Sequence, residues 1–329
     1  MADVLQVFDE LTAVTTKHRQ KRVTDNVTQN NQVLRRMKER GNVSIYGGAE
    51  IVEPVGLVEN STITNIAGFQ TAPTNYDNNV TAVRAPWVSK WMSVSAPGDL
   101  LRKNNGADAL VKLVNAKVDI AEASAANYMN AEVCGDGSID QSIFGLKLWI
   151  QQAASAAGTG GSGVGLAGGV DAGTYSHGAN RSQTFSATAI SDTTGLTARS
   201  DFNKLYLNLV FDMEKPDVVV ATYDVYNVYE ASIQQQMRYM DAKSADGGVE
   251  SVMYKHMPVY FDANANFASA GQLAYMLNTK HLYMFEHPQA RWEKEEARRP
   301  YNADAIIIPF LWMGNMICKS RRTQGILHG

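Results

Sequence analysis

The sequence predicts an α+β fold, and three stretches of the 329-residue chain carry that prediction. Residues 106–135 place apolar side chains at helical spacing and predict one long helix. Residues 43–100 are rich in Val, Ile, Thr and aromatic residues, which favours strands. Beyond residue 140, strand and helix patterns mix without regular βαβ alternation, so a parallel α/β sheet is not expected.

The first 46 residues predict an N-terminal arm of two helical pieces, the second of which ends at Gly41. The apolar stripe of the second piece is thin, and a segment of this kind rarely folds alone. We therefore expect the arm to lie on a neighbouring chain. The stripe consists of Val27, Val33, Leu34 and Met37.

Residues 47–100 predict a long β-hairpin with a turn-rich tip at 72–79. From residue 87 to residue 95 the odd-numbered side chains share one face of a strand and the even-numbered ones the other. Because a two-stranded hairpin is marginal in water, it needs a surface to lie on, in this chain or another. The predicted strands are 51–58, 62–69 and 80–94.

The long helix at 106–135 would be roughly 43 Å long at 1.5 Å per residue. Asn104 or Asn105 is expected to cap its start, and Gly135 to end it in a left-handed conformation. A flexible, Gly-rich loop is expected at 153–173. Beyond this loop the pattern predicts helices at 200–213 and 223–237, and strands at 217–221, 252–261, 274–284 and 306–317.

Composition excludes several classes of protein. The net charge of −3 argues against a general polyanion binder. There is no signal-peptide pattern and no apolar run of roughly 18 residues, so we expect a soluble protein made in a cytoplasm. The two cysteines, Cys134 and Cys318, are too few for a disulfide framework or a zinc site, and both are expected to be buried free thiols.

No motif predicts a catalytic, cofactor-binding or metal site, so an enzyme is not expected. Residues 163–168 match G-x-G-x-x-G, but they lie in a Gly-rich tract without the preceding strand that a dinucleotide site requires. His281 and His287, with Glu286, are conceivable metal ligands, yet they lack the paired spacing of zinc sites. No G-x-S-x-G nucleophile motif is present.

The order of arm, long hairpin, long helix, mixed domain and terminal strand resembles the major capsid proteins of tailed bacteriophages, which have the Hong Kong 97-like capsid fold. Five stretches carry the resemblance: GGAEIVEPVGLVENSTI, VSAPGDLLRKNNGADALVKLVNAKVDIAEASAANYMN, QQQMRYMDAKSADGGVESVMYKHMPVYFD, LNTKHLYMFEHP and FLWMGNMICKSRRTQGIL.

The resemblance implies a structural subunit of an icosahedral bacteriophage head, which self-assembles into the shell that encloses double-stranded DNA. It also implies a division of the chain into named regions. These are an N-terminal arm (1–46), an extended hairpin loop (47–100), a peripheral domain with the long spine helix (101–140), an axial domain (141–287) and a return segment of the peripheral domain (288–329).

The implied partners are other copies of the chain, in pentamers and hexamers, together with a portal protein, a separate scaffolding protein and a decoration protein. Weak, non-specific contact with packaged DNA is expected, and no membrane contact. The implied location is the virion, after assembly in the host bacterial cytoplasm. A separate scaffold is expected because only about 45 residues precede the hairpin. No lysine lies between Lys38 and Lys90, so we expect a shell without the covalent lysine–asparagine cross-links of some relatives.

Two alternatives remain open. An encapsulin-like compartment would use the same fold to hold cargo enzymes, and an apolar pocket for a cargo tail would support it. An enzyme using the Gly-rich loop for a nucleotide is the second alternative, and large hollow particles of nucleotide-independent subunits would exclude it.

The candidate functional residues are therefore residues of subunit interfaces. Trp87 and Trp91 of the hairpin are expected to bury against other protein, since Trp is enriched at binding hot spots. Charged pairing at the hairpin base is expected to set the register between subunits. The residues for that pairing are Arg84, Arg102 and Lys103, with Glu53 and Glu59 as partners; Arg321 and Arg322 are candidates for the inner surface or an interface.

Overall fold

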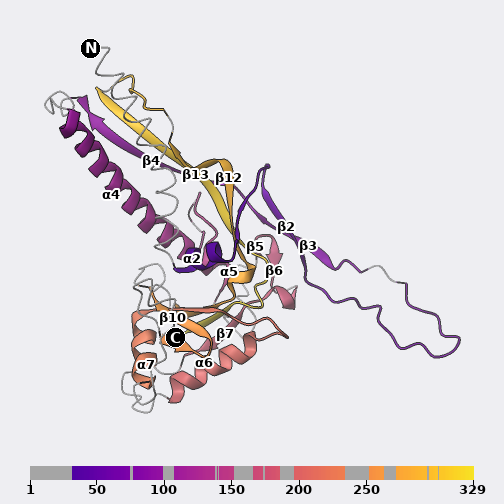
Figure 1. Cartoon of the computed structure of the whole chain (residues 1–329). Coiled ribbons are helices and arrows are strands. Elements are labelled where there is room, and N and C mark those ends of the chain that lie inside the picture. Colours follow the sequence, from indigo (N-terminus) through magenta and orange to yellow (C-terminus); the bar gives the residue numbers. More distant parts are fainter. Residues whose placement is uncertain are drawn as a thin grey trace.

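The computed structural model shows two bodies and a hairpin that projects from the junction between them (Figure 1). The first, the elongated body, contains a four-stranded sheet and a long helix. The second, the six-stranded body, contains a six-stranded sheet and two shorter helices. The structure describes residues 32–74, 77–98, 107–137, 139, 141–151, 166–172, 175–185, 196–233, 252–262, 272–294, 296–302 and 304–329.

The sheet of the elongated body has the strand order β1-β12-β13-β4. Strand β1 pairs parallel to β12, while β12–β13 and β13–β4 are antiparallel. Helix α4 lies along this sheet and packs on β4 (Figure 1). The bounds are β1 (Val43–Ile45), β4 (Val88–Pro97), β12 (Leu282–Lys294), β13 (Ala305–Cys318) and α4 (Ala107–Cys134).

Helix α4 confirms the predicted long helix, with 28 residues. Its inward face is buried on the sheet through Ala125, Met129 and Val133, which lie in the main apolar core. The predicted stop is wrong in one detail: Gly137 (φ +68°), two residues after Gly135, adopts the left-handed conformation. The proposed caps, Asn104 and Asn105, and the side chains of residues 107–117 lie outside the described residues.

A largely buried ion pair joins α4 to β4. Lys90 Nζ lies 3.0 Å from Glu132 Oε2, and the two side chains are only 11% and 13% exposed. The same carboxylate oxygen accepts a hydrogen bond from the Ile143 amide at 2.9 Å. Glu132 therefore ties together the strand, the helix and the segment that follows the helix.

The hairpin differs from its prediction in two ways. Residues 80–94 do not form one strand: β3 pairs only with β2, the chain breaks at Pro86 and Trp87, and β4 pairs with β13. Residues 62–69 form no strand. Residues 88–97 thus belong to the sheet of the elongated body, where their predicted alternation of exposed and covered side chains is confirmed. The two hairpin strands are β2 (Ile51–Gly56) and β3 (Val80–Ala85).

The six-stranded sheet has the order β7-β14-β11-β8-β10-β9 and is covered on both faces. Val219 and Ala221 of β8 face the helices α6 and α7, while Val218 and Val220 face the core shared with the elongated body. A strand that is covered on both faces has a continuous run of apolar residues in the sequence. The run in β8 therefore allowed this strand to be predicted from the sequence. The bounds are β7 (Arg181–Thr184), β8 (Val218–Ala221), β9 (Val252–Tyr254), β10 (Met257–Phe261), β11 (Gln272–Leu277), β14 (Gly325–His328), α6 (Leu196–Leu209) and α7 (Tyr223–Ile233).

Two of the predicted strands are each two strands. The predicted strand 252–261 is the hairpin β9–β10, which turns at Lys255. The predicted strand 274–284 crosses between the bodies, because β11 lies in one sheet and β12 in the other, with η2 (Thr279–His281) between them. The chain then returns, since β14 joins the six-stranded sheet rather than the elongated body.

The described part of the arm packs on its own chain, contrary to the expectation that it lies on a neighbour. Helix α2 (Gln32–Glu39) buries Val33, Leu34 and Met37 in the main core and contacts η2 and β12. The stripe is thin because α2 covers only a small junction between the two bodies. Residues 1–31, including Val27, lie outside the described residues.

Part of the predicted flexible loop is a small hairpin packed on β3. Strands β5 (Leu166–Ala167) and β6 (Val170–Asp171) turn at Gly168, whose carbonyl accepts a hydrogen bond from the Arg84 amide at 2.8 Å. A Cβ at Gly168 would lie 2.6 Å from Val83 Cγ1, so a larger residue here would force Val83 or the backbone to shift. The remaining short elements are α5 (Leu146–Trp149) and η1 (Ser176–Gly178).

Both cysteines are buried free thiols, as predicted. Burial raises the pKa of Cys318 to about 12 and that of Cys134 still further, so neither is a nucleophile at neutral pH. No helix in the part of the chain that the structure describes is long and apolar enough to cross a bilayer.

We expect Lys90→Ala to lower the free energy of unfolding by about 3 kcal/mol, because it leaves the Glu132 carboxylate buried without its cation. The matched control is Lys147→Ala, whose partner Asp136 lies 3.8 Å away at a more exposed site, and which should cost less than about 1 kcal/mol. Urea unfolding followed by tryptophan fluorescence measures both. Equal effects of the two variants would contradict the special role of the buried pair.

Candidate functional site: the crossover between the bodies and the extended loop

The described residues contain no group of three or more His, Cys, Asp or Glu side chains arranged to hold a metal. The two histidines considered as ligands have different partners. His281 lies 3.3 Å from Glu214, whereas the ring of His287 lies 5.6 Å from that of Trp87. Among the described residues, hydrogen-bonding and charged side chains cluster instead where the chain crosses between the two bodies.

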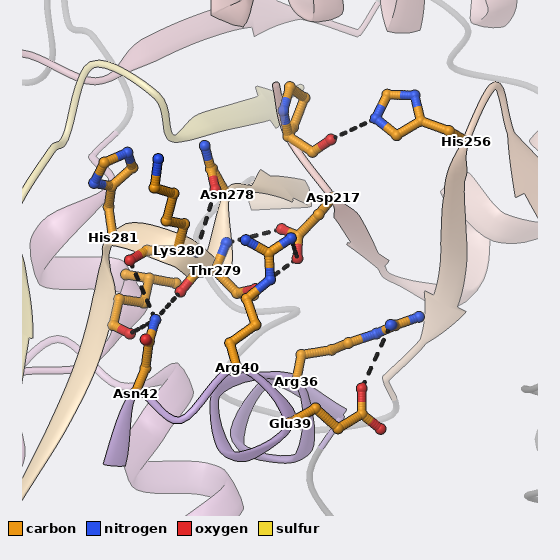
Figure 2. Close-up of polar contacts among 12 residues, drawn as sticks. Arg36, Glu39, Arg40, Asn42, Asp217, His256, Asn278, Thr279, Lys280 and His281 are labelled. Atoms are coloured by element: carbon orange, nitrogen blue, oxygen red, sulfur yellow. Dashed lines mark hydrogen bonds and ion pairs between the residues drawn. The ribbon is translucent and has the colours of Figure 1, made fainter. Parts of the chain in front are cut away.

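Residues 278–281 form the crossover from β11 to β12, and side chains from three other segments converge on it. Figure 2 shows Arg40, Asn42 and Asp217 around the crossover. The three segments are the link from α2 to β1, the link from α6 to β8, and the link from β13 to β14. We call this group the crossover clamp. It consists of Arg40, Asn42, Glu214, Asp217, Asn278, Thr279, Lys280, His281 and Gln324.

Asn42 holds the crossover from the side of the arm. Its buried amide nitrogen donates to the carbonyl oxygens of Thr279 at 2.6 Å, Lys280 at 3.2 Å and Leu282 at 3.1 Å. A turn leaves such carbonyls without ladder partners, and a buried carbonyl left unpaired is costly. One side chain therefore contacts three carbonyls of the crossover, and the Thr279 carbonyl also accepts from the Leu282 N–H.

Asp217 holds the crossover from the side of the six-stranded sheet. Its carboxylate accepts hydrogen bonds from the Thr279 amide at 2.8 Å and the Thr279 hydroxyl at 2.5 Å. Arg40 lies 3.1 Å from the same carboxylate. Asp217 thus links the arm and the crossover through a single side chain that is 15% exposed.

Glu214 and Gln324 complete the clamp. Glu214 pairs with Lys280 and His281 and accepts a hydrogen bond from the Asn278 amide group at 3.1 Å. Gln324 accepts from the Asn278 backbone N–H and donates to the Asn278 carbonyl, both at 3.0 Å. The hydrogen bond from Lys280 lowers the pKa of Glu214, and burial lowers that of His281.

This arrangement holds parts of the chain in a defined orientation. Its donors and acceptors face each other across segments that belong to both sheets, and a connected polar network of this kind favours one geometry. The clamp therefore fixes the angle between the elongated body and the six-stranded body.

The second candidate region is the extended loop, which we define as residues 47–87. One ion pair ties its base to the body: Glu53 lies 3.0 Å from Lys319. Two contacts hold the base itself together, Arg84 with Glu50 at 2.9 Å and Trp87 Nε1 with the Gly48 carbonyl at 2.8 Å. Beyond the base the loop extends away from both bodies (Figure 1). Its distal part exposes large apolar side chains, including Ile63 (85% exposed) and Phe69 (fully exposed).

The predicted interface residues fall into different environments. Trp91 lies on the outer face of β4 and is 59% exposed, and its interface role stays a prediction, whereas Trp87 is half-buried against its own chain. Arg84 pairs with Glu50 rather than with Glu53 or Glu59, which contact Lys319 and His177. Arg102 and Lys103 lie outside the described residues.

The structure contradicts the expectation that Arg321 lies on an inner surface or at an interface. Its side chain is buried, and its Nε donates to the Trp149 carbonyl at 2.8 Å. Arg322 is half-buried over the Phe211 ring at 3.8 Å, and one of its guanidinium nitrogens lies 2.7 Å from His177 Nδ1. A basic run near the end of the chain therefore serves mainly to hold the chain together.

Sequence reasoning missed the clamp residues. One signal was available: the polar run Asn278-Thr-Lys-His281 interrupts two apolar strands and marks a turn. The partners Asn42, Asp217 and Gln324 carry no local signal, because only the tertiary fold brings them to the turn.

Comparison with solved structures identifies the fold. The capsid protein of cyanophage A-1(L) is 13% identical, with a TM-score of 0.58 over 88% of this chain and 90% of that chain. The capsid of a native GTA particle is 12% identical, with a TM-score of 0.54 over 89% of each chain. The SrpI encapsulin from Synechococcus elongatus PCC 7942 is 7% identical, with a TM-score of 0.54 over 87% of this chain and 84% of that chain.

No protein-family model and no curated protein matches the sequence. The structural likenesses extend over nearly nine-tenths of the chain, so they concern the whole architecture. The chain has the fold of tailed-phage major capsid proteins, and both the α+β class and the Hong Kong 97-like fold predicted from the sequence are confirmed.

We expect Asn42→Ala to lower the free energy of unfolding by about 2 kcal/mol, because it removes a buried donor that three carbonyls of the crossover share. Asn60→Ala is the matched control, since the Asn60 side chain bonds only its own exposed turn in the loop. Chemical unfolding measures both variants. A cost below about 0.5 kcal/mol for Asn42→Ala would contradict the role given to the clamp.

We also expect the free energy of unfolding to fall in acid because of two residues of the clamp. The pKa of His281 lies below its ordinary value of 6.5 in the folded chain, so the unfolded chain binds more protons below about pH 6.5, and acid favours unfolding. The lowered pKa of Glu214 adds a second loss below its ordinary value of 4.5. Melting temperatures measured against pH should fall in both ranges. His281→Gln should remove the first fall, and its persistence in that variant would refute the assignment.

Proposed function

We propose that the chain is the structural subunit of an icosahedral bacteriophage head and that it self-assembles into the shell around double-stranded DNA. The observation that carries the proposal is the extended loop on a capsid fold. Its distal part has no sheet partner among the described residues outside the loop itself, yet it exposes Ile63 and Phe69. Exposed apolar groups of this size mark a protein-binding surface.

The loop suits an adjacent subunit as its binding surface. Two strands with open edges and apolar side chains can add to a neighbouring chain, which buries both the edges and the side chains. Heterologous contacts of this kind close into rings when rotation brings the last subunit back to the first. Pentamers and hexamers of a closed shell are such rings.

The other elements of the function come from the resemblance of the sequence to phage capsid proteins. The role is structural and not enzymatic, and the location is the virion after assembly in the bacterial cytoplasm. Scaffolding, portal and decoration proteins are further partners, and contact with packaged DNA is weak. The elongated body acts as the peripheral domain and the six-stranded body as the axial domain.

An encapsulin-like compartment is the second candidate, because an encapsulin shares the fold over 87% of this chain. The two functions differ in what the particle contains. Particles purified from infected or lysogenic cells should hold double-stranded DNA if the first proposal is right, and a cargo protein without DNA if the second is right.

Electron microscopy and sedimentation of the purified chain, alone or with the scaffolding protein from the same genome, test the proposal. We expect closed icosahedral particles, which run as single-chain bands on a denaturing gel because the shell is not cross-linked. The double variant Ile63→Ser, Phe69→Ser should leave soluble subunits. Discrete small oligomers from the unaltered chain under both conditions would contradict the proposal.

We expect Trp91→Ala to lower particle yield at least about tenfold, since a central Trp at an interface often contributes about 2 kcal/mol or more. Subunit solubility should change little, because Trp91 is 59% exposed in the single chain. Ser93→Ala, on the same face of β4, is the matched control. Equal particle yields for the two variants in sedimentation would refute the interface role of Trp91.

A further inference from the structure

Two opposite edges of the six-stranded body carry exposed apolar side chains and charges of opposite sign. Strands β8 and β10 run parallel, so their N-terminal ends lie on one side of the body and their C-terminal ends on the opposite side. We use the word edge for these two sides, and not for an edge strand of the sheet. Each edge is extended by a turn or a helix end. The two edges therefore present different sets of side chains to a neighbouring molecule.

The edge at the N-terminal ends, which we call the basic edge, joins the outer side of α6 to two turns. His256, in the turn before β10, lies 2.9 Å from the carbonyl of Pro216, in the segment before β8, which holds the two turns together. The exposed apolar side chains of this edge are Leu207 (61%), Phe211 (48%) and Met213 (89%).

Lysines surround that apolar group. Lys204 belongs to α6, and Lys255, in the turn between β9 and β10, sits over the ring of Tyr206 in α6 at 3.8 Å. Lys215 lies in the segment between α6 and β8. The acidic residues here are Asp212, Glu214 and Asp201. Glu214 pairs with the crossover, and Asp201 is buried beneath Lys204, which lies 3.3 Å away. The surface of this edge is therefore basic on balance.

The edge at the C-terminal ends, which we call the acidic edge, joins the start of α7 to the end of β10. Tyr223 (65% exposed) and Phe261 (44% exposed) form an aromatic pair with ring centroids 6.1 Å apart. The exposed charged side chain next to them along the chain is Asp224, whereas Asp262 is half-buried and interacts with the buried Cys134 thiol. This edge thus combines an exposed aromatic group with negative charge.

We propose that the basic edge of one copy binds the acidic edge of the next copy around the axis of a pentamer or hexamer. Two copies of one edge would place like charges together, which opposes a symmetric contact. The basic and acidic edges are complementary in charge, and aromatic and Met side chains are enriched in interface cores. A contact between two different surfaces of one chain is the heterologous kind that closes a ring.

This inference rests on the proposed function, because a ring within a shell supplies the second copy. It goes further by naming which two surfaces of the six-stranded body meet. The ring contact is also separate from the contact made by the extended loop. Both edges lie on the six-stranded body, whereas β4 lies in the elongated body.

Cysteine cross-linking tests the contact directly. The variant Met213→Cys, Tyr223→Cys places one thiol on each edge, and the native Cys134 and Cys318 are buried and free, so they leave little background. A short bismaleimide added to assembled particles should give covalent rings up to pentamers and hexamers on a denaturing gel. Each single-cysteine variant, the matched control, should remain monomeric.

The outcomes separate the two proposals. Particles that form normally but give no rings, or give the same dimers as a single-cysteine variant, would overturn the edge contact and leave the shell function standing. If the unaltered chain forms no particles, the shell function fails and the edge contact with it.

Charge reversal gives an independent readout. Lys215→Glu and Asp224→Lys should each reduce particle yield about tenfold, and the two changes together should restore at least half of it. Arg299→Glu, an exposed charge reversal on the elongated body, is the control. Circular dichroism of the soluble subunit shows whether each variant folds. Well-folded single variants with unchanged particle yield would overturn the edge contact.

Discussion

The polar crossover between the two sheets is the constraint on which the rest of the structure depends. The chain leaves the six-stranded sheet at Leu277 and enters the elongated sheet at Leu282, so residues 278–281, with the return from β13 to β14 and the shared apolar core, set the angle between the bodies. A turn at that place has backbone groups that neither sheet can satisfy. Asn42, Asp217 and Gln324 supply the missing partners, and each comes from a different segment. The crossover is thereby held in one geometry.

The two candidate regions differ in how far their side chains find partners within the chain. At the clamp, donors, acceptors and charges are matched within the chain. In the distal part of the extended loop and on the edges of the six-stranded body, large apolar side chains such as Phe69 and Met213 stay exposed. A subunit of a shell needs both conditions, because a fixed shape sets the curvature and unfilled surfaces provide the contacts. The stability of the whole would then be collective.

The sequence was sufficient wherever the local pattern and the tertiary environment agree. Helix α4, the alternation of β4 and the apolar run of β8 were predictable because each is dictated by the face or faces it buries. The break at Trp87 and the split of 274–284 were not, because both depend on which sheet accepts the strand. The prediction for Arg321 was wrong because a basic run is typical of a surface, whereas its side chain is buried and donates to the Trp149 carbonyl. Nothing local marks Asn42 as a partner of Thr279.

Cryo-electron microscopy of the assembled particle tests the central claim most directly. We expect a closed icosahedral shell in which residues 57–79 of each subunit lie across an adjacent subunit, while the crossover clamp keeps its contacts inside each chain. A particle in which the loop folds back on its own subunit, or a chain that stays monomeric under all assembly conditions, would contradict the account.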